Sequence, residues 1–400
     1  MTGIVLSASV RQNLLSLQST AELLSTTQNR LATGNKVNSA LDNPTNFFTA
    51  QGLNNRSNDI NNLLDSIGNG VQVLQAANTG LTSLQKLVDT AKSIANQVLQ
   101  TTVGYSTKSS ATTTVGAVGS AADLTTGGTT TLQGKTVIFT PATGSATTLT
   151  FSNVVGAGNV NSLDALNAAI SGAGIGVTAS ISSTGFLTFT SSNDNASQAI
   201  TVAGGAAANT VQITGTAVAA APVTAVADSA SQAIRANLVS QYNGILSQIT
   251  NTAQDASFNG INLLNGDTLK LTFNETGKST LSITGVTYGA TGLGLNVLVS
   301  GTDFLDSSSA NKALTALSSA STSLRTEASA LGSNLSIVQI RQDFSKNLIN
   351  VLQTGASNLT LADTNEEAAN SQALSTRQSI AVSALALANQ SQQSVLQLLR

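Results

Sequence analysis

The stretch RLATGNKVNSALDNPTNFF, residues 30–48, separates two long segments that both have the apolar spacing of a helix. Gly34 has the position of a residue that follows a helix C-terminus in a left-handed conformation, and Pro44 suits the first turn of a new helix. The sequence therefore predicts a helix that stops near residue 33, a loop that includes Asn38 and Asp42, and a second helix from about residue 45.

The segment before this loop has apolar side chains at steps of four and three residues, which is the spacing of a coiled-coil seam. A glutamine interrupts the row, and a polar residue of this kind fixes the register of paired helices at some cost in stability. The row consists of Val10, Leu14, Leu17, Ala21, Leu24, Gln28 and Leu31.

The segment after the loop repeats its apolar residues every seven positions, which predicts one long helix over roughly residues 45–101. Gly70 and Gly80 lie inside it, and each costs about 1 kcal/mol relative to alanine. The heptad row consists of Leu53, Ile60, Ile67, Leu74, Leu81, Val88 and Ala95.

The C-terminal part has the same kind of pattern, with a predicted break at Gly355 and a last helix from about Asp363. Asp363, Glu366 and Glu367 then lie in a first helical turn, where negative charge complements the helix dipole. We interpret these carboxylates as helix-stabilising rather than as metal ligands or acid–base groups. The apolar rows are Leu317, Leu324, Leu331 and Val338, followed in the last helix by Ala381, Leu385, Ala388, Gln392, Val395 and Leu399.

Between residues 103 and 226 the helical period disappears, and short segments alternate apolar and polar residues between turn residues. This pattern predicts short antiparallel strands, with one short helix capped by Ser162. A disordered low-complexity linker is the alternative. Helical spacing returns from Asp228, and TLKLTFNE with STLSITGV predicts a hairpin. The expected fold class is mainly α with an inserted β-rich domain, in which long N- and C-terminal coiled-coil helices pair with each other beside an outer helical bundle.

The composition narrows the possible functions. Charged residues make up 9% of the chain and the net charge is −2, which does not favour a nucleic-acid or membrane-surface partner. The chain has no histidine and no cysteine, so the commonest general base and metal ligands are missing. We expect no catalytic, cofactor-binding or metal-binding residues. The first 18 residues do not have the pattern of a Sec-type signal peptide, and no apolar run is long enough to span a bilayer.

Long helices at both ends of a chain, each with one apolar seam, favour burial of the remaining stripe against other copies of the same chain. Three motifs resemble those of bacterial flagellins, and of alphaproteobacterial flagellins in particular. They are LATGNKVNSALDNP at residues 31–44, FNGINLLNG at 258–266 and ALANQSQQSVLQLLR at 386–400. The resemblance covers roughly residues 1–100 and 228–400.

The resemblance implies a three-part organisation and a structural function. Residues 1–44 and 355–400 would form an inner coiled-coil layer with its connecting loop, residues 45–102 and 227–354 an outer helical layer with the hairpin, and residues 103–226 a variable surface domain. In the best-known flagellins the insertion comes later in the chain, after the first two outer helices. The self-assembly seam would consist of Val10, Leu14, Leu17, Leu24, Leu31, Leu385, Ala388, Val395 and Leu399.

The same resemblance implies partners and a location. The chain would be exported unfolded through the flagellar type III pathway and polymerise with itself in the extracellular filament. Its other partners would be an export chaperone at the C-terminal helix, junction and cap proteins, and O-linked glycans on the surface domain. Two alternatives stay open, a hook–filament junction protein and a secreted adhesin or binding module.

One further implication concerns the innate receptor that recognises many flagellins through arginines of the first outer helix. A gapless comparison places Thr90 and Lys92 at the positions of two such arginines. Because Thr90 carries no charge and has a short side chain, we expect the main receptor contact to be lost.

Overall fold

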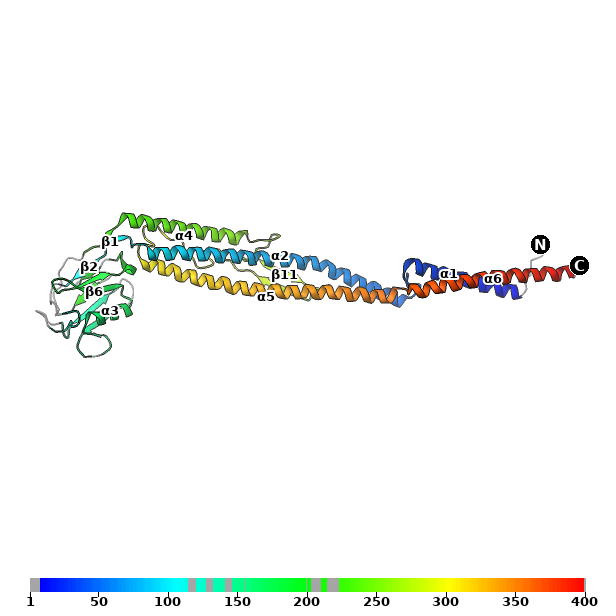
Figure 1. Cartoon of the computed structure of the whole chain (residues 1–400), viewed down its shortest axis with the longest axis horizontal. Coiled ribbons are helices and arrows are strands. Elements are labelled where there is room, and N and C mark those ends of the chain that lie inside the picture. The colour runs from blue at the N-terminus through cyan, green and yellow to red at the C-terminus, as the bar shows by residue number, and fades with distance from the viewer. Residues whose placement is uncertain are drawn as a thin grey trace. The chain divides into compact units, whose positions relative to one another are not determined.

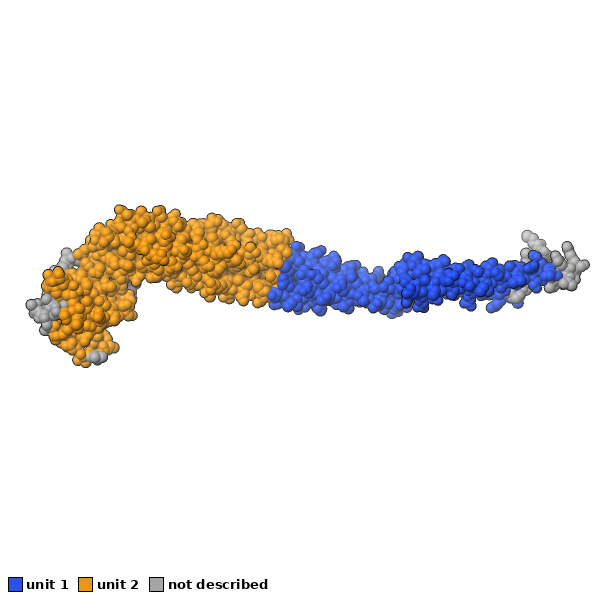
Figure 2. Space-filling view, in the orientation of Figure 1, with its two compact units in different colours: residues 1–71, 270–282, 336–400 blue, residues 72–269, 283–335 orange. Residues whose placement is uncertain are grey.

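A computed structural model describes residues 8–113, 120–126, 132–140, 146–154, 156–198, 200–202, 210–213 and 223–398 (Figure 1). The helices are α1 (Ala8–Thr33), α2 (Pro44–Gln100), α3 (Leu163–Gly172), α4 (Ser229–Asp255), α5 (Ser307–Thr360) and α6 (Thr364–Leu398). The chain divides into two compact units, coloured separately in Figure 2. Residues 1–71, 270–282 and 336–400 form unit 1, and residues 72–269 and 283–335 form unit 2.

The predicted interruption after residue 33 is confirmed. α1 ends at Thr33, Gly34 has a φ of +70°, and α2 begins at Pro44. A left-handed φ favours glycine because a side chain at Cβ would be strained there. The loop is also attached to the end of α5, since the amides of Lys36 and Val37 both donate to the carbonyl of Thr360, at 2.8 and 3.3 Å.

α2 continues through both of its inner glycines, and each permits a close contact. A Cβ atom on Gly70 would lie 2.4 Å from Cδ2 of Leu271, and one on Gly80 would lie 2.6 Å from Cβ of Ala256. Both distances are shorter than van der Waals contact, so the loss in helix propensity is offset by close packing.

The predicted break at Gly355 is wrong, because α5 continues to Thr360. Gly355 lies against α2, where a Cβ atom would stand at an ordinary contact distance of 3.5 Å from Cδ1 of Leu53. The break comes at residues 361–363, and α6 then begins with Asp363 accepting hydrogen bonds from the amides of Asn365 and Glu366. The buried heptad row of α5 is Ala310, Leu317, Leu324, Leu331, Val338, Ser345 and Leu352.

The described part of the insert is rich in strands and has a core of its own in unit 2. β1 (Tyr105–Thr107) pairs with β10 (Val226–Ala227), and β2 (Ser110–Thr112), β7 (Leu187–Ser191) and β6 (Val177–Ile181) form a three-stranded sheet. A five-stranded sheet has the order β5 (Asn159–Val160), β4 (Thr147–Phe151), β3 (Thr136–Thr140), β9 (Thr210–Ile213) and β8 (Thr201–Val202). The three-residue 3₁₀ helix η1 (Asn193–Asn195) follows β7.

The sequence predicted antiparallel strands, but two of the strand pairs are parallel. β4 pairs with β5 in parallel, and so does β8 with β9. Alternating apolar residues specify which face of a strand is buried and carry no information about its direction, so the sequence could not distinguish parallel from antiparallel pairs.

The predicted cap of the short helix is confirmed, because Oγ of Ser162 accepts from the amide of Ala165 in the first turn of α3.

A buried arginine holds together the segments from which the insert emerges. Arg235 in α4 is 1% exposed, and its guanidinium donates to the carbonyls of Val98, Thr101 and Thr102 at the end of α2 and of Phe304 before α5. Burial lowers the pKa of Arg235, but the carbonyls at a helix C-terminus favour a cation.

The predicted hairpin follows α4 as β11 (Thr268–Thr272) paired with β12 (Thr280–Thr284).

None of the described helices combines the length and hydropathy that a membrane span requires. The observed architecture, with long terminal helices and an inserted β-rich domain, is the fold class that the sequence predicts.

Candidate assembly surface

The terminal helices α1 and α6 lie side by side in unit 1 (Figure 1). On α1, the residues that are buried or half-buried within the chain are Val10, Asn13, Leu17, Thr20, Leu24, Thr27 and Arg30. Thr20 tolerates this position because its hydroxyl donates to the carbonyl of Ser16 at 2.8 Å. The covered row therefore takes threonines where the predicted row has Ala21 and Gln28, which are exposed.

As a result, the predicted seam residues of α1 fall into two groups. Val10, Leu17 and Leu24 are covered by the chain's own packing, whereas Leu14 and Leu31 remain exposed. Leu15 and Leu23 are exposed as well, although the sequence pattern did not place them in the seam. α1 thus has one row of residues that is covered within the chain and a second set of leucines that remains exposed.

α6 shows the same division. Leu385 and Ala388 are half-buried, as is Ala381 one turn earlier. Ile380, Val382 and Leu387 are exposed, and Leu387 has 67% of its surface accessible. Of the other predicted seam residues, the side chain of Val395 and the whole of Leu399 lie outside the described residues.

An ion pair fixes the register where α6 begins. Nη1 of Arg30 lies 3.3 Å from Oε1 of Glu367, and Glu367 is buried. The carboxylate that the sequence assigned to the first turn of a helix is in that turn, and it also contacts the last turn of α1. A buried carboxylate needs such a partner because desolvation would otherwise disfavour its charge.

The loop between α1 and α2 is a hydrogen-bonded turn around Asp42. Oδ2 of Asp42 accepts from the amides of Ser39 at 2.8 Å and Asn38 at 3.0 Å, and from the Ser39 hydroxyl. These bonds, with the Ser39 amide as the largest cause, lower the pKa of Asp42. The turn presents Leu41 with 96% of its surface exposed. Leu41 thus lies within the loop defined by the predicted residues Gly34, Asn38, Asp42 and Pro44. The sequence prediction did not include it.

α5 carries a second apolar row that the sequence analysis missed. Ile337, Phe344 and Val351 are exposed and repeat every seven residues, each one position before a residue of the buried row. Ile340 adds a fourth exposed apolar side chain on this part of the helix. The signal was present in the sequence, since a second heptad row next to the first indicates a helix with two packing faces.

The two positions compared with receptor-binding arginines lie on α2. Thr90 is exposed, and its hydroxyl donates to the carbonyl of Lys86 on the same helix, while Lys92 is half-buried.

Among the described residues, no group of histidine, cysteine, aspartate or glutamate has the arrangement to hold a metal ion.

Comparison with known proteins bears directly on these surfaces. The profile of the bacterial flagellin N-terminal helical region matches residues 6–136, and that of the bacterial flagellin C-terminal helical region matches residues 314–399. Together they cover more than half of the chain, including α1, most of α5 and α6.

Similar curated proteins are flagellins of alphaproteobacteria. Flagellin FljM of Caulobacter vibrioides is 33% identical over 165 residues, which is 41% of this chain and 59% of the relative. Flagellin FljK of the same organism is 32% identical over the same shares, and a flagellin of Brucella melitensis is 30% identical over 182 residues, 43% of this chain and 64% of the relative. The matches thus span less than two thirds of each relative. The two terminal regions place the chain in the bacterial flagellin family.

Proposed function

We propose that this chain is the structural subunit of a bacterial flagellar filament and that it polymerises with copies of itself. The observation that carries the proposal is the second, uncovered apolar row on helices that already bury one row within the chain. On α5 this row has the heptad spacing that a coiled-coil contact requires.

The energetics favour assembly over an isolated monomer. Each large apolar side chain that leaves water contributes about 1.5–3 kcal/mol, and unit 1 exposes several on α1, α5 and α6. Because these rows lie on different helices, a contact between unlike faces of two copies can repeat without closing, which generates a helical polymer.

The layer assignment is part of the proposal. α1 and α6 form the inner layer, α2, α4, α5 and the hairpin form the outer layer, and the β-rich insert faces solvent. The buried apolar core of the insert supports this assignment, because a domain that covers its own apolar residues requires no neighbour.

The partners belong to the proposal as well. We infer export in an unfolded state through the flagellar type III pathway, recognition of α6 by an export chaperone, contact with junction and cap proteins, and an extracellular location in the filament. Exposed serines and threonines of the insert are candidates for O-linked glycans. The role is structural rather than catalytic.

Polymerisation of the purified chain tests the proposal against its alternatives. A filament subunit forms long polymers, alone or on short filament seeds, that sediment and appear as filaments by electron microscopy. A hook–filament junction protein caps seeds without extending them, and an adhesin does neither. Failure to extend seeds over a range of salt and protein concentrations would contradict the filament proposal.

The receptor expectation has its own assay. Monomeric protein applied to cells that report activation of the flagellin receptor is expected to act as a weak agonist, since Thr90 supplies neither the charge nor the reach of an arginine. The variant Thr90→Arg is the sharpest comparison. Potency equal to that of a strong agonist flagellin, in the unmodified protein, would contradict the expectation.

A further inference from the structure

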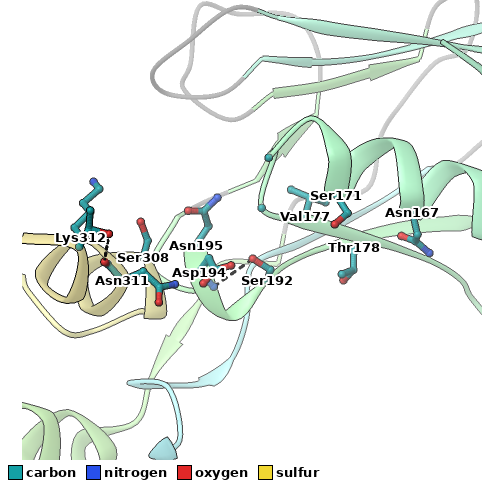
Figure 3. A pocket seen from close by; sticks show the side chains of 13 residues that line it. Asn167, Ser171, Val177, Thr178, Ser192, Asp194, Asn195, Ser308, Asn311 and Lys312 are labelled. Atoms are coloured by element: carbon teal, nitrogen blue, oxygen red, sulfur yellow. Dashed lines mark hydrogen bonds between the residues drawn. The ribbon is translucent and has the colours of Figure 1, made fainter. Parts of the chain in front are cut away.

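A groove of about 830 Å³, lined mainly by polar residues, lies in unit 2 between the insert and the first turns of α5 (Figure 3). Ser308, Asn311 and Lys312 of α5 form one wall, and η1 with the ends of α3 and β6 forms the other. Its volume is within the range of small-molecule sites, about 300–1,000 Å³.

The two walls are held by contacts within the unit. Oγ of Ser197 donates to Oδ2 of Asp306 at 2.8 Å, which ties the segment after η1 to the start of α5. The lining residue Asn167 donates to the carbonyl of Ala179 at 2.9 Å and accepts from its amide at 2.7 Å, joining α3 to β6. The groove therefore has fixed sides.

A glycine shapes the rim of the groove. Gly176 has a φ of +68°, and a Cβ atom on it would lie 1.8 Å from Nδ2 of Asn195. Only glycine accommodates Asn195 there, and this amide also donates to the carbonyl of Ile175 at 3.3 Å. The Asn195 side chain is thus fixed beside the groove with its other amide atoms available.

Several polar groups of the groove have unused hydrogen-bonding capacity. Within the described residues, neither the carboxylate of Asp194 nor the ammonium of Lys312 has an ion-pair or side-chain hydrogen-bond partner. The hydroxyls of Ser171 and Ser308 also point along this surface without a side-chain partner in the described part of the chain.

The chemistry of the lining excludes several classes of ligand. Val177 is the one apolar side chain among the described lining residues, so the groove offers no cluster of apolar side chains to a peptide that binds through apolar anchors. An adjoining hollow of about 470 Å³ adds Asp303 and Asp306, so carboxylates outnumber the single Lys312 and disfavour a phosphate or carboxylate ligand. The described residues offer no cluster for a metal ion.

An uncharged molecule rich in hydroxyl groups satisfies these constraints, because each hydroxyl both donates and accepts a hydrogen bond. We propose that this groove binds a short neutral oligosaccharide. Such binding goes beyond the role of a filament subunit and would give the insert a recognition function that does not depend on assembly.

The test uses the full monomeric chain on an array of neutral and sialylated oligosaccharides, followed by calorimetric titration with the strongest neutral hit. We expect binding of at least one neutral di- or trisaccharide and none of the sialylated comparators. Inorganic phosphate should not compete. Absence of any neutral hit, preference for sialylated glycans, or competition by phosphate would overturn the proposal.

Two matched variants place the site. Thr178 and Ser180 are both exposed on β6, and each donates to a carbonyl of β7 at 3.3 Å, but only Thr178 lines the groove. Thr178→Trp fills the groove and is expected to weaken binding by about tenfold or more, whereas Ser180→Trp leaves it within about twofold. Equal binding by both variants would overturn the assignment.

Two smaller substitutions cover the case in which tryptophan disturbs the sheet. Asp194→Ala and Lys312→Met remove exposed groups without partners, so unfolding of the monomer should be unchanged. Each should weaken saccharide binding several-fold through the loss of a charge-assisted hydrogen bond. Unchanged binding in both would show that the saccharide lies elsewhere.

Discussion

The β-rich insert buries large apolar side chains in its core, whereas the α1–α6 pair leaves several such side chains exposed. In the insert, the rings of Phe139, Phe151 and Phe189 are at most 1% exposed. On α6, Ile380 and Leu387 are both more than 60% exposed. The described part of the insert has a buried apolar core of its own, whereas the helix pair leaves large apolar side chains exposed.

The difference follows from geometry. Two sheets and a helix can surround a set of side chains from several directions. A helix in a two-helix pair can cover only one narrow stripe, so any second apolar stripe stays in water until a further helix arrives. The uncovered apolar stripes of the terminal pair are therefore available for contacts with other chains.

The largest expected effect comes from a charge on the uncovered row. Leu387→Asp should abolish sedimentable polymer, because a carboxylate buried without a partner costs several kcal/mol in every subunit. The circular dichroism of the monomer should not change. Val154→Asp is the matched control, since Val154 is equally exposed at 69% but lies in the insert. Normal polymer from Leu387→Asp, or loss of polymer from Val154→Asp, would break the comparison.

The second effect concerns the free monomer. Ordering a residue costs about 1–2 kcal/mol of backbone entropy, and the helix pair buries too few side chains to offset this along its whole length. Limited proteolysis of the monomer should therefore remove α1 and α6 before it cuts the insert, and assembly should protect both ends. Mass spectrometry of the fragments checks the order. Earlier cleavage within the insert would contradict the prediction.

The third effect concerns the stability of the monomer rather than the formation of polymer. Arg235→Met leaves the carbonyls around the guanidinium without donors and should lower the free energy of unfolding by about 2–4 kcal/mol, as measured by urea denaturation.

Two further variants sharpen this result. Arg235→Lys restores the charge without the planar set of donors and should recover part of the loss. Arg56→Met serves as control, since the Arg56 side chain is half-exposed and its pair with Glu275 at 2.9 Å is screened by solvent. Equal effects of Arg235→Met and Arg56→Met would refute the role of burial.

The smallest effect concerns pH at the loop between α1 and α2. The folded-state pKa of Asp42 is lowered by its hydrogen bonds, so its contribution to stability is present above the unfolded pKa of about 3.9 and is lost as the pH falls through the folded value. An NMR titration of the Asp42 carboxyl should show the lowered pKa, and Ser39→Ala, which removes the hydroxyl donor but keeps the Ser39 amide, should raise the pKa only in part. An ordinary pKa in the unmodified protein would contradict the turn geometry.

The helices and most of their ends could be predicted from local sequence features. Seven-residue repeats defined α2 and most of α5, and Gly34 with Pro44 set the loop between α1 and α2 to within one or two residues. These features are local, because helix periodicity, a left-handed glycine and a proline in a first turn act over a few residues.

Which residues of those helices are buried within the chain depends on how the helices pack against one another. Steps of three and four residues fit two neighbouring rows equally well, and the choice of Thr20 over Ala21 depends on the shape of α6 and on a hydroxyl that bonds to its own helix. The burial of Arg235 is decided in the same way, by groups distant in sequence. Local sequence specifies a residue's conformation, whereas its partner depends on how separate elements pack.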